Sequence, residues 1–208
     1  METDWSVAAG ADDPVLELPW RDDESGLAWT NLQMSAEAQK ERMAAIPEAV
    51  ASPALADSLA LLNAPQGLLL TTKCDRWLLD EEERADLADA LDAPPAACGY
   101  GSYIDVLTAR AIPMTDLLLH EGWARLTAMR CAAVAAEDAR MELVVRPACS
   151  KGIWGYGITL YCYACGMDEA HAETAWASAL KQITPVLIEE AENLLASADD
   201  ANQPGRLS

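Results

Sequence analysis

The amino-acid sequence predicts an α+β domain in which a small antiparallel sheet is covered by several helices. Apolar residues recur at helical spacing in several segments, β-rich runs cluster in two regions, and the regular strand–helix–strand alternation of a doubly wound sheet is missing. We place residues 31–197 in a single domain. An acidic, partly flexible N-terminal arm (1–30) precedes it, and a flexible C-terminal tail (198–208) follows.

Two short helices and a strand are predicted first. Ser35 precedes a run of good helix formers, and Ser52 followed by Pro53 has the form of an N-cap with proline at the first helical position. After a Pro-Gln-Gly break, residues 67–73 (GLLLTTK) are typical of a buried strand.

The next segments continue the mixed pattern. Asp80 and Glu83 form a capping-box pattern, which predicts a helix that runs to about Asp92. The Gly-aromatic run 98–104 fits neither a helix nor a strand clearly. A long apolar stripe then predicts a helix at about 114–140.

The last third predicts a hairpin and a helix. The β-rich runs 142–148 and 157–165 are joined by a Gly-rich stretch, SKGIWGYG, so we expect them to pair antiparallel as a hairpin (about 142–165) with a long loop. Asp168 is the expected N-cap of a final helix, about 168–197, which Pro185 would kink or split.

Composition limits the function. The chain has 14 Lys and Arg against 34 Asp and Glu, a formal net charge of −20. Phosphate groups are bound by clustered cations, so this charge argues against direct binding of nucleic acid or of an anionic membrane. The first residues are acidic and interrupted by prolines, which is not typical of a secretory signal, and no apolar stretch approaches the roughly 20 residues that span a bilayer. We expect a soluble, cytoplasmic protein whose six cysteines are reduced.

The densest acidic segment lies in the helix predicted after Asp80. Glu82, Asp86 and Asp89 share one face of that helix at spacings of four and three. One interpretation is a solvated helix start, because the helix dipole favours acids there. Another is a ridge that presents carboxylates to a basic protein, for example a nucleic-acid-binding protein whose DNA groove the ridge imitates. Adaptation to salt or simple solubility would also make the chain acidic.

The loop predicted at 150–157 carries Lys151, Trp154 and Tyr156 among three glycines. Exposed aromatic side chains are common interface anchors, which favours a recognition loop. The alternative is a hairpin loop whose tryptophan folds back on the core.

The leading hypothesis is a non-catalytic interaction protein that binds a basic protein partner through these acidic and aromatic residues. It would act as an inhibitor, adaptor or decoy. Small viral or plasmid proteins that mimic nucleic acid, those of anti-CRISPR type among them, belong to this class.

A small soluble enzyme is the second hypothesis. Its ligand-binding residues would be Gly99, Tyr100, Gly101, Arg146 and Lys151. The Gly-Tyr-Gly run is neither a phosphate loop nor a complete dinucleotide fingerprint, and no catalytic residue is predicted.

Cys162 and Cys165 form a CxxC, the basis of a third hypothesis, a metal or redox module. Successive side chains of a strand point to opposite faces, so the two thiols would point apart unless the strand ended between them. We therefore expect core thiols, no bound metal and no cofactor.

Overall fold

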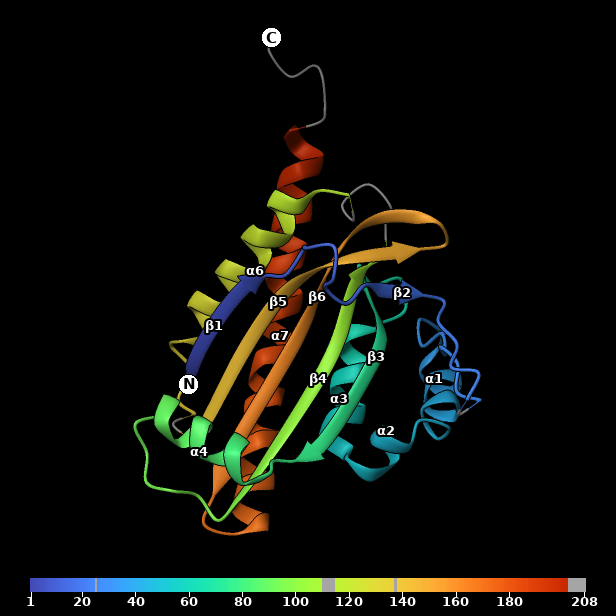
Figure 1. Ribbon diagram of the computed structural model, residues 1–208. Coiled ribbons are helices and arrows are strands. Elements are labelled where there is room, and N and C mark those ends of the chain that lie inside the picture. Colours follow the sequence, from blue (N-terminus) through green and yellow to red (C-terminus); the bar gives the residue numbers. More distant parts are fainter. Residues whose placement is uncertain (25, 110–114, 137, 202–208) are drawn as a thin grey trace.

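The computed structural model describes residues 1–24, 26–109, 115–136 and 138–201, with side chains described as far as residue 196. Figure 1 shows the arrangement of its elements. The strands are β1 (Glu2–Val7), β2 (Leu16–Leu18), β3 (Leu69–Leu78), β4 (Cys98–Thr108), β5 (Ala139–Ser150) and β6 (Ile153–Gly166). The helices are α1 (Ala36–Met43), α2 (Pro47–Ala51), α3 (Pro53–Leu62), α4 (Glu81–Ala90), α6 (Leu117–Cys131) and α7 (Glu169–Ala201).

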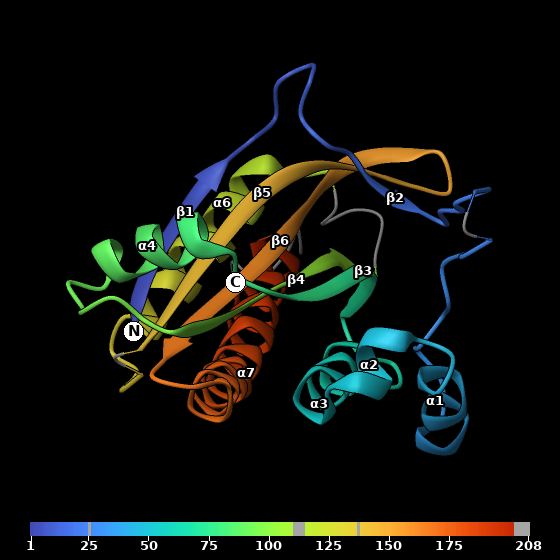
Figure 2. The ribbon, with the colours of Figure 1, turned by 60° about the horizontal axis from the view of Figure 1, so that its bottom comes forward.

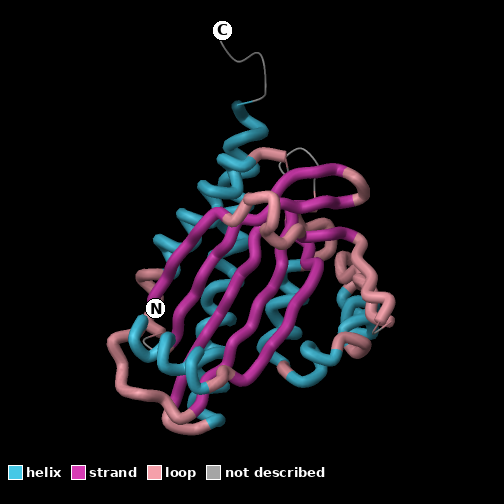
Figure 3. The backbone as a smooth tube through the Cα atoms, viewed as in Figure 1, coloured by secondary structure: helices cyan, strands magenta, loops and turns pink. Residues whose placement is uncertain are grey.

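The strands form one sheet in the order β1-β5-β6-β4-β3, with β2 beside the end of β5 (Figure 3). Neighbours from β5 to β3 are antiparallel, whereas β1 and β2 run parallel to β5. The predicted α+β class, a mostly antiparallel sheet with helices packed against it, is therefore confirmed.

Helices α3, α6 and α7 cover one face of the sheet (Figure 2). The main core lies between them and the strands, and Trp123 and Trp176 are its largest fully buried side chains. The predicted last helix is confirmed as α7, which contains Pro185. Asp168 accepts a hydrogen bond from the backbone N–H of His171 at 2.8 Å, as expected of an N-cap. Within the described residues, no helix is long and apolar enough to cross a membrane.

The predicted hairpin is confirmed, but its long loop is not. Strands β5 and β6 pair from Ala139 opposite Ala164 to Ser150 opposite Ile153. The turn consists of Lys151 and Gly152, both with positive φ, at 51° and 84°. Two residues with positive φ are the pattern of a type I′ turn, whose twist matches that of paired strands. Most of the predicted loop 150–157 is therefore strand.

The long helix predicted at about 114–140 is also corrected. Helix α6 ends at Cys131, with Ala132 as its C-cap, and strand β5 begins at Ala139. Ala139 and Met141 are buried in the sheet, paired with β6. Pairing with neighbouring strands therefore overrides the helix propensity of the alanine-rich segment.

Shorter predictions hold with changed bounds. Asp80 and Glu83 form both hydrogen bonds of the capping box at the start of α4. Ser52 caps α3. The strand predicted at 67–73 is β3, which continues to Leu78, and the ambiguous run 98–104 begins β4.

The N-terminal segment, predicted as an arm, contributes strands β1 and β2 to the sheet. Farther along it, the indole N–H of Trp20 donates to the carbonyl of Thr72 at 2.7 Å, and that of Trp29 donates to Thr71 at 3.0 Å. Of the tail predicted at 198–208, residues 198–201 continue helix α7, and residues 202–208 lie outside the described residues.

Candidate functional site

The sheet face opposite α3, α6 and α7, here called the open face, is covered at its two ends. Helix α4 lies over one end, where Leu87 packs with Leu79 and Cys165. The segment around β2 lies over the other end, where Leu16 and Leu18 pack with their neighbours. Both coverings lie in front of the strands in Figure 1. The middle of the open face is where the candidate site lies.

Four aromatic rings form what we call the aromatic cluster: Trp77 of β3, Tyr103 of β4, and Tyr161 and Tyr163 of β6. Their centroids are 6.0 to 6.5 Å apart, and Tyr161 and Tyr163 stack with their planes 3° apart. Strand alternation places these rings on one face, because their neighbours in sequence Ile104 and Cys162 point into the core on the other face. All four side chains are partly exposed.

Gly101 makes room for this cluster. It pairs with Trp77 on one side and Tyr163 on the other, and a Cβ atom there would lie 2.7 Å from two carbons of the indole. The indole therefore lies directly over the glycine, a close approach that a larger residue would prevent. The Trp77 N–H donates to the carboxylate of Glu83 at 3.2 Å, which ties the cluster to the first turn of α4.

Next to the aromatic cluster, four side chains form a polar cluster that is centred on Thr159. The Thr159 hydroxyl donates to Asp105 Oδ1 at 2.7 Å and accepts from Arg146 Nε at 3.2 Å, while a terminal guanidinium nitrogen of Arg146 donates to the Tyr161 hydroxyl at 3.3 Å. Asp105 is 6% exposed. Its burial raises the pKa of its carboxyl from 3.8 to about 6, against the opposing effects of Thr159, Arg146 and Lys73.

Exposed acids lie at one end of the open face and along two of its edges. Glu82, Asp86 and Asp89 lie on α4, and Asp75 lies on the edge strand β3, opposite Tyr103. On β1, Glu2 and Asp4 are opposite Arg140 and Glu142 and therefore share the open face. We call these six residues the acidic rim.

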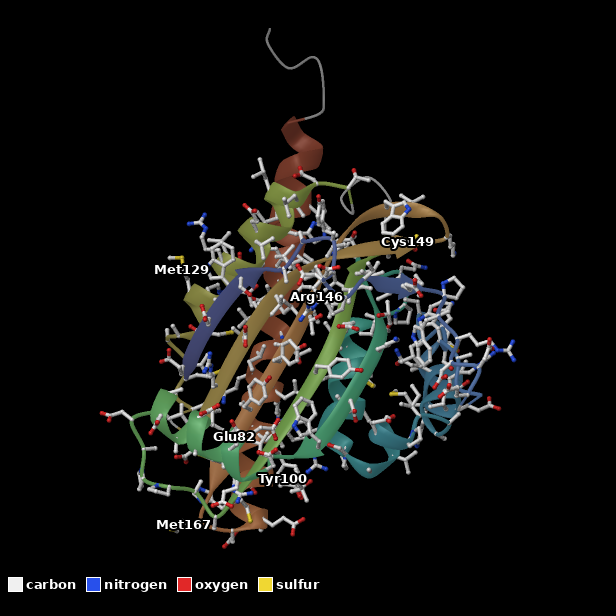
Figure 4. The ribbon with its side chains drawn as sticks, viewed as in Figure 1. Glu82, Tyr100, Met129, Arg146, Cys149 and Met167 are labelled. Carbon is white, nitrogen blue, oxygen red and sulfur yellow. The ribbon has the colours of Figure 1, made fainter. Side chains whose placement is uncertain are left out.

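The structure separates the two groups of residues predicted to bind a partner. Glu82, Asp86 and Asp89 are together on α4, whereas Lys151 and Trp154 are exposed at the tip of the β5–β6 hairpin. Figure 4 shows Glu82 and the hairpin residue Cys149 far apart, toward opposite ends of the sheet. Tyr156 lies on the helix-covered side, with its ring 6.2 Å from that of His120.

The residues of the enzyme hypothesis are also dispersed. Gly99 and Gly101 lie within β4 under Leu79 and Trp77, where a Cβ atom would collide with those side chains. Tyr100 points to the helix side, where its hydroxyl donates to Glu169 at 2.8 Å. Arg146 belongs to the polar cluster, and Lys151 to the hairpin tip.

Cys162 and Cys165 lie on opposite faces of the sheet, as the strand alternation predicts. Cys162 is in the main core, and Cys165 is under α4. Burial raises the pKa of both thiols, which disfavours the thiolate form that binds metals and attacks disulfides.

Sequence reasoning missed Asp105, Thr159 and the aromatic cluster. One signal was present in the segment ITLYCYAC. The alternation that assigns Ile158, Leu160 and Cys162 to the core also assigns Thr159, Tyr161 and Tyr163 to the other face.

No protein-family model matches the chain, and comparisons with curated proteins and with solved structures found no match. The function is therefore inferred from the open face itself.

Proposed function

We propose that the chain is a non-catalytic interaction protein that binds a basic segment of another protein across its open face. One observation carries this proposal: four partly exposed aromatic rings lie together on the sheet face that the acidic rim borders at one end and along two edges. Inhibitors, adaptors and decoys of nucleic-acid-binding proteins are the class that this surface fits.

The two parts of the surface have complementary roles. Arginine and lysine side chains are attracted to the faces of tyrosine and tryptophan rings, by about 0.5–1 kcal/mol each at exposed sites. The acidic rim would bring a basic segment to the face and raise the association rate. Alternate side chains of an extended segment are roughly 6.6 Å apart, close to the centroid spacing of the aromatic cluster. An extended basic segment could therefore contact two rings at once.

A sheet face with aromatic side chains is also a platform on which single-stranded nucleic acid stacks. The acidic rim disfavours that partner here, since its carboxylates would face the phosphates. A formal net charge of −20 adds repulsion at longer range.

The test is a binding titration with a labelled peptide of alternating arginine and serine, followed by fluorescence anisotropy at 50 mM and 300 mM salt. The triple variant Glu82→Gln, Asp86→Asn, Asp89→Asn should bind at least about tenfold more weakly at low salt, mainly through a slower association. Tyr163→Ser should weaken binding at both salt concentrations, because the contact with its ring is not screened.

A matched triple variant separates a local effect from net charge. Glu37→Gln, Glu41→Gln and Asp57→Asn remove the same charge from exposed positions on α1 and α3. This control should retain wild-type affinity. Equal weakening by both triple variants, or preferential binding of a single-stranded oligonucleotide, would overturn the proposal.

A further inference from the structure

The open face contains a small pocket between the aromatic cluster and the segment formed by the start of β2 and the residues before it. Its volume is about 200 Å³, and Pro14 to Glu17 line it on one side. The strands contribute the remaining lining residues, which are Lys73, Tyr103, Asp105, Arg146, Thr159 and Tyr161. A pocket of this size suits a molecule of a few heavy atoms rather than a large cofactor.

The polar side chains of the pocket retain hydrogen-bonding capacity. Among the described residues, the Asp105 carboxylate accepts a hydrogen bond at Oδ1. Its second oxygen, Oδ2, can accept further hydrogen bonds. Arg146 donates hydrogen bonds to described residues from Nε and from one terminal nitrogen. A guanidinium has five N–H groups, so others can donate to a ligand. Because Asp105 is only 6% exposed, a donor that reached its carboxylate would be shielded from water.

The pocket holds two cations in a chain whose formal net charge is −20. Lys73 and Arg146 supply two positive charges, and the carboxylates of Asp105 and of the exposed Glu17 supply two negative charges. A ligand carboxylate that lay next to Arg146 and Lys73 would pair with these cations. If the ligand also carried a hydrogen-bond donor next to its carboxylate, that donor would face Asp105, and the two carboxylates would not be in direct contact.

We propose that this pocket binds a small organic acid that carries a hydroxyl or amino group on the carbon next to its carboxylate. Arg146 and Lys73 bind the carboxylate. The adjacent O–H or N–H donates to Asp105, and the rings of Tyr103 and Tyr161 flank the carbon atoms. This site differs from the proposed protein-binding function, because it needs neither α4 nor Trp77.

The test is an NMR titration of the ¹⁵N-labelled full chain with three probes, namely acetate, glycolate and glycine. Glycolate or glycine should shift the amide signals of the pocket strands saturably, with a Kd at least tenfold lower than that of acetate, which lacks the adjacent donor. Similar Kd values for all three probes, or linear shifts without saturation, would overturn the proposal.

Two variants test which side chains bind which group of the ligand. Asp105→Asn, which keeps an oxygen to accept from Thr159, should reduce the preference for glycolate or glycine over acetate to less than about threefold. Lys73→Gln, at an exposed position, should weaken all carboxylate probes at least fivefold without loss of fold. Lys40→Gln, at an exposed position on α1, removes the same charge outside the pocket and is the matched control. An equal effect of Lys73→Gln and Lys40→Gln would show attraction by net charge and contradict the site. The titration uses no protein partner, so its failure is distinguishable from failure of the proposed function.

Discussion

Arg76 and Arg146 lie on opposite faces of the same sheet, and each is surrounded by aromatic and acidic side chains. On the helix-covered face, the Arg76 guanidinium is 3.9 Å from the ring centroid of Tyr100 and 4.8 Å from that of Trp176, and it forms an ion pair with Glu173 at 2.9 Å. Its side chain is 12% exposed. On the open face, Arg146 contacts Thr159 and Tyr161 and lines a pocket.

The difference lies in what surrounds each group. Around Arg76, further hydrogen bonds link the sheet to α7: Trp176 donates to Ser102 at 2.9 Å, and Tyr100 donates to Glu169. These interactions join β3 and β4 to α7 and leave little room for a ligand. Around Arg146, one side of the cluster faces the pocket. The same residue types therefore stabilise the fold on one face and remain available for binding on the other.

The largest effect should come from the core tryptophan of the closed face. Trp176→Ala removes a fully buried side chain and should lower the free energy of unfolding by about 3–5 kcal/mol, as measured by urea denaturation. Trp77→Ala, in the partly exposed aromatic cluster, is the comparison and should cost less than half as much. Equal losses would show that the open face is as essential to the core as the closed one.

Asp105 allows a test by pH. Its pKa is about 6 in the folded chain and 3.8 in the unfolded reference, so the folded state binds its proton more tightly. The stability that comes from this tighter proton binding is present in full below pH 3.8 and is lost as the pH rises to about 6. Asp105→Asn cannot ionise. The variant should therefore gain stability relative to wild type by on the order of 3 kcal/mol between pH 4 and pH 6, with no further change above.

Urea denaturation of both proteins across this pH range measures the difference. Asp75→Asn, at an exposed position on the neighbouring strand, is the control and should follow the wild-type curve. If the Asp105→Asn curve also runs parallel to that of wild type, the carboxyl is solvated in the folded chain.

Local sequence signals predicted a large part of the fold. The capping box at Asp80 and Glu83 and the β-rich runs of the hairpin each involve residues that are near in sequence. The pairing of β1 has no such signal. Glu2 lies opposite Arg140, and the short run ETDWSV is polar, so its strand depends on a partner 138 positions away. The end of α6 was missed because the segment after it is alanine-rich and carries no local signal that Ala139 and Met141 are buried in the sheet.

The candidate site was less predictable than the fold. Its members come from four strands, and their proximity depends on the register that places Asp105 opposite Thr159 and Gly101 between Trp77 and Tyr163. Sequence spacing does not give that register. Sequence spacing does relate the acidic residues of α4 to one another, since a single helix fixes their relation, and all three are exposed. Gly99 and Gly101 suggested ligand binding, but in the fold these glycines make room for Leu79 and Trp77.

Substitution of the two arginines should have a smaller, unequal effect on stability. Arg76→Met removes the ion pair with Glu173 and the stacking on two rings, and should lower the free energy of unfolding by about 2 kcal/mol. Arg146→Met leaves the hydrogen bond from Thr159 to Asp105 in place, so at pH 7 the loss should be about 1 kcal/mol or less. Denaturation of both variants under identical conditions gives the ratio. A larger loss for Arg146→Met would reverse the assignment of structural and binding roles.

The smallest effect on stability should be that of Trp154, at the hairpin tip. Its side chain is 64% exposed, whereas Trp176 is fully buried, so the two tryptophans represent the extremes of the molecule. Trp154→Ala should change the free energy of unfolding by no more than about 0.5 kcal/mol, as is usual for surface positions. If the hairpin tip is a second contact for the basic partner, the same variant should weaken binding by about 2 kcal/mol or more.

The peptide titration proposed for the open face measures that second effect, with Ile153→Ala as a neighbouring control at another exposed apolar position. Unchanged binding of Trp154→Ala would limit recognition to the aromatic cluster and the acidic rim. A loss of stability near that of Trp176→Ala would instead make Trp154 a packing residue, in conflict with its exposure. The hairpin tip and α4 lie toward opposite ends of the sheet (Figure 4). A loss of binding both in Trp154→Ala and in the triple variant of α4 would therefore require a partner segment long enough to span the open face.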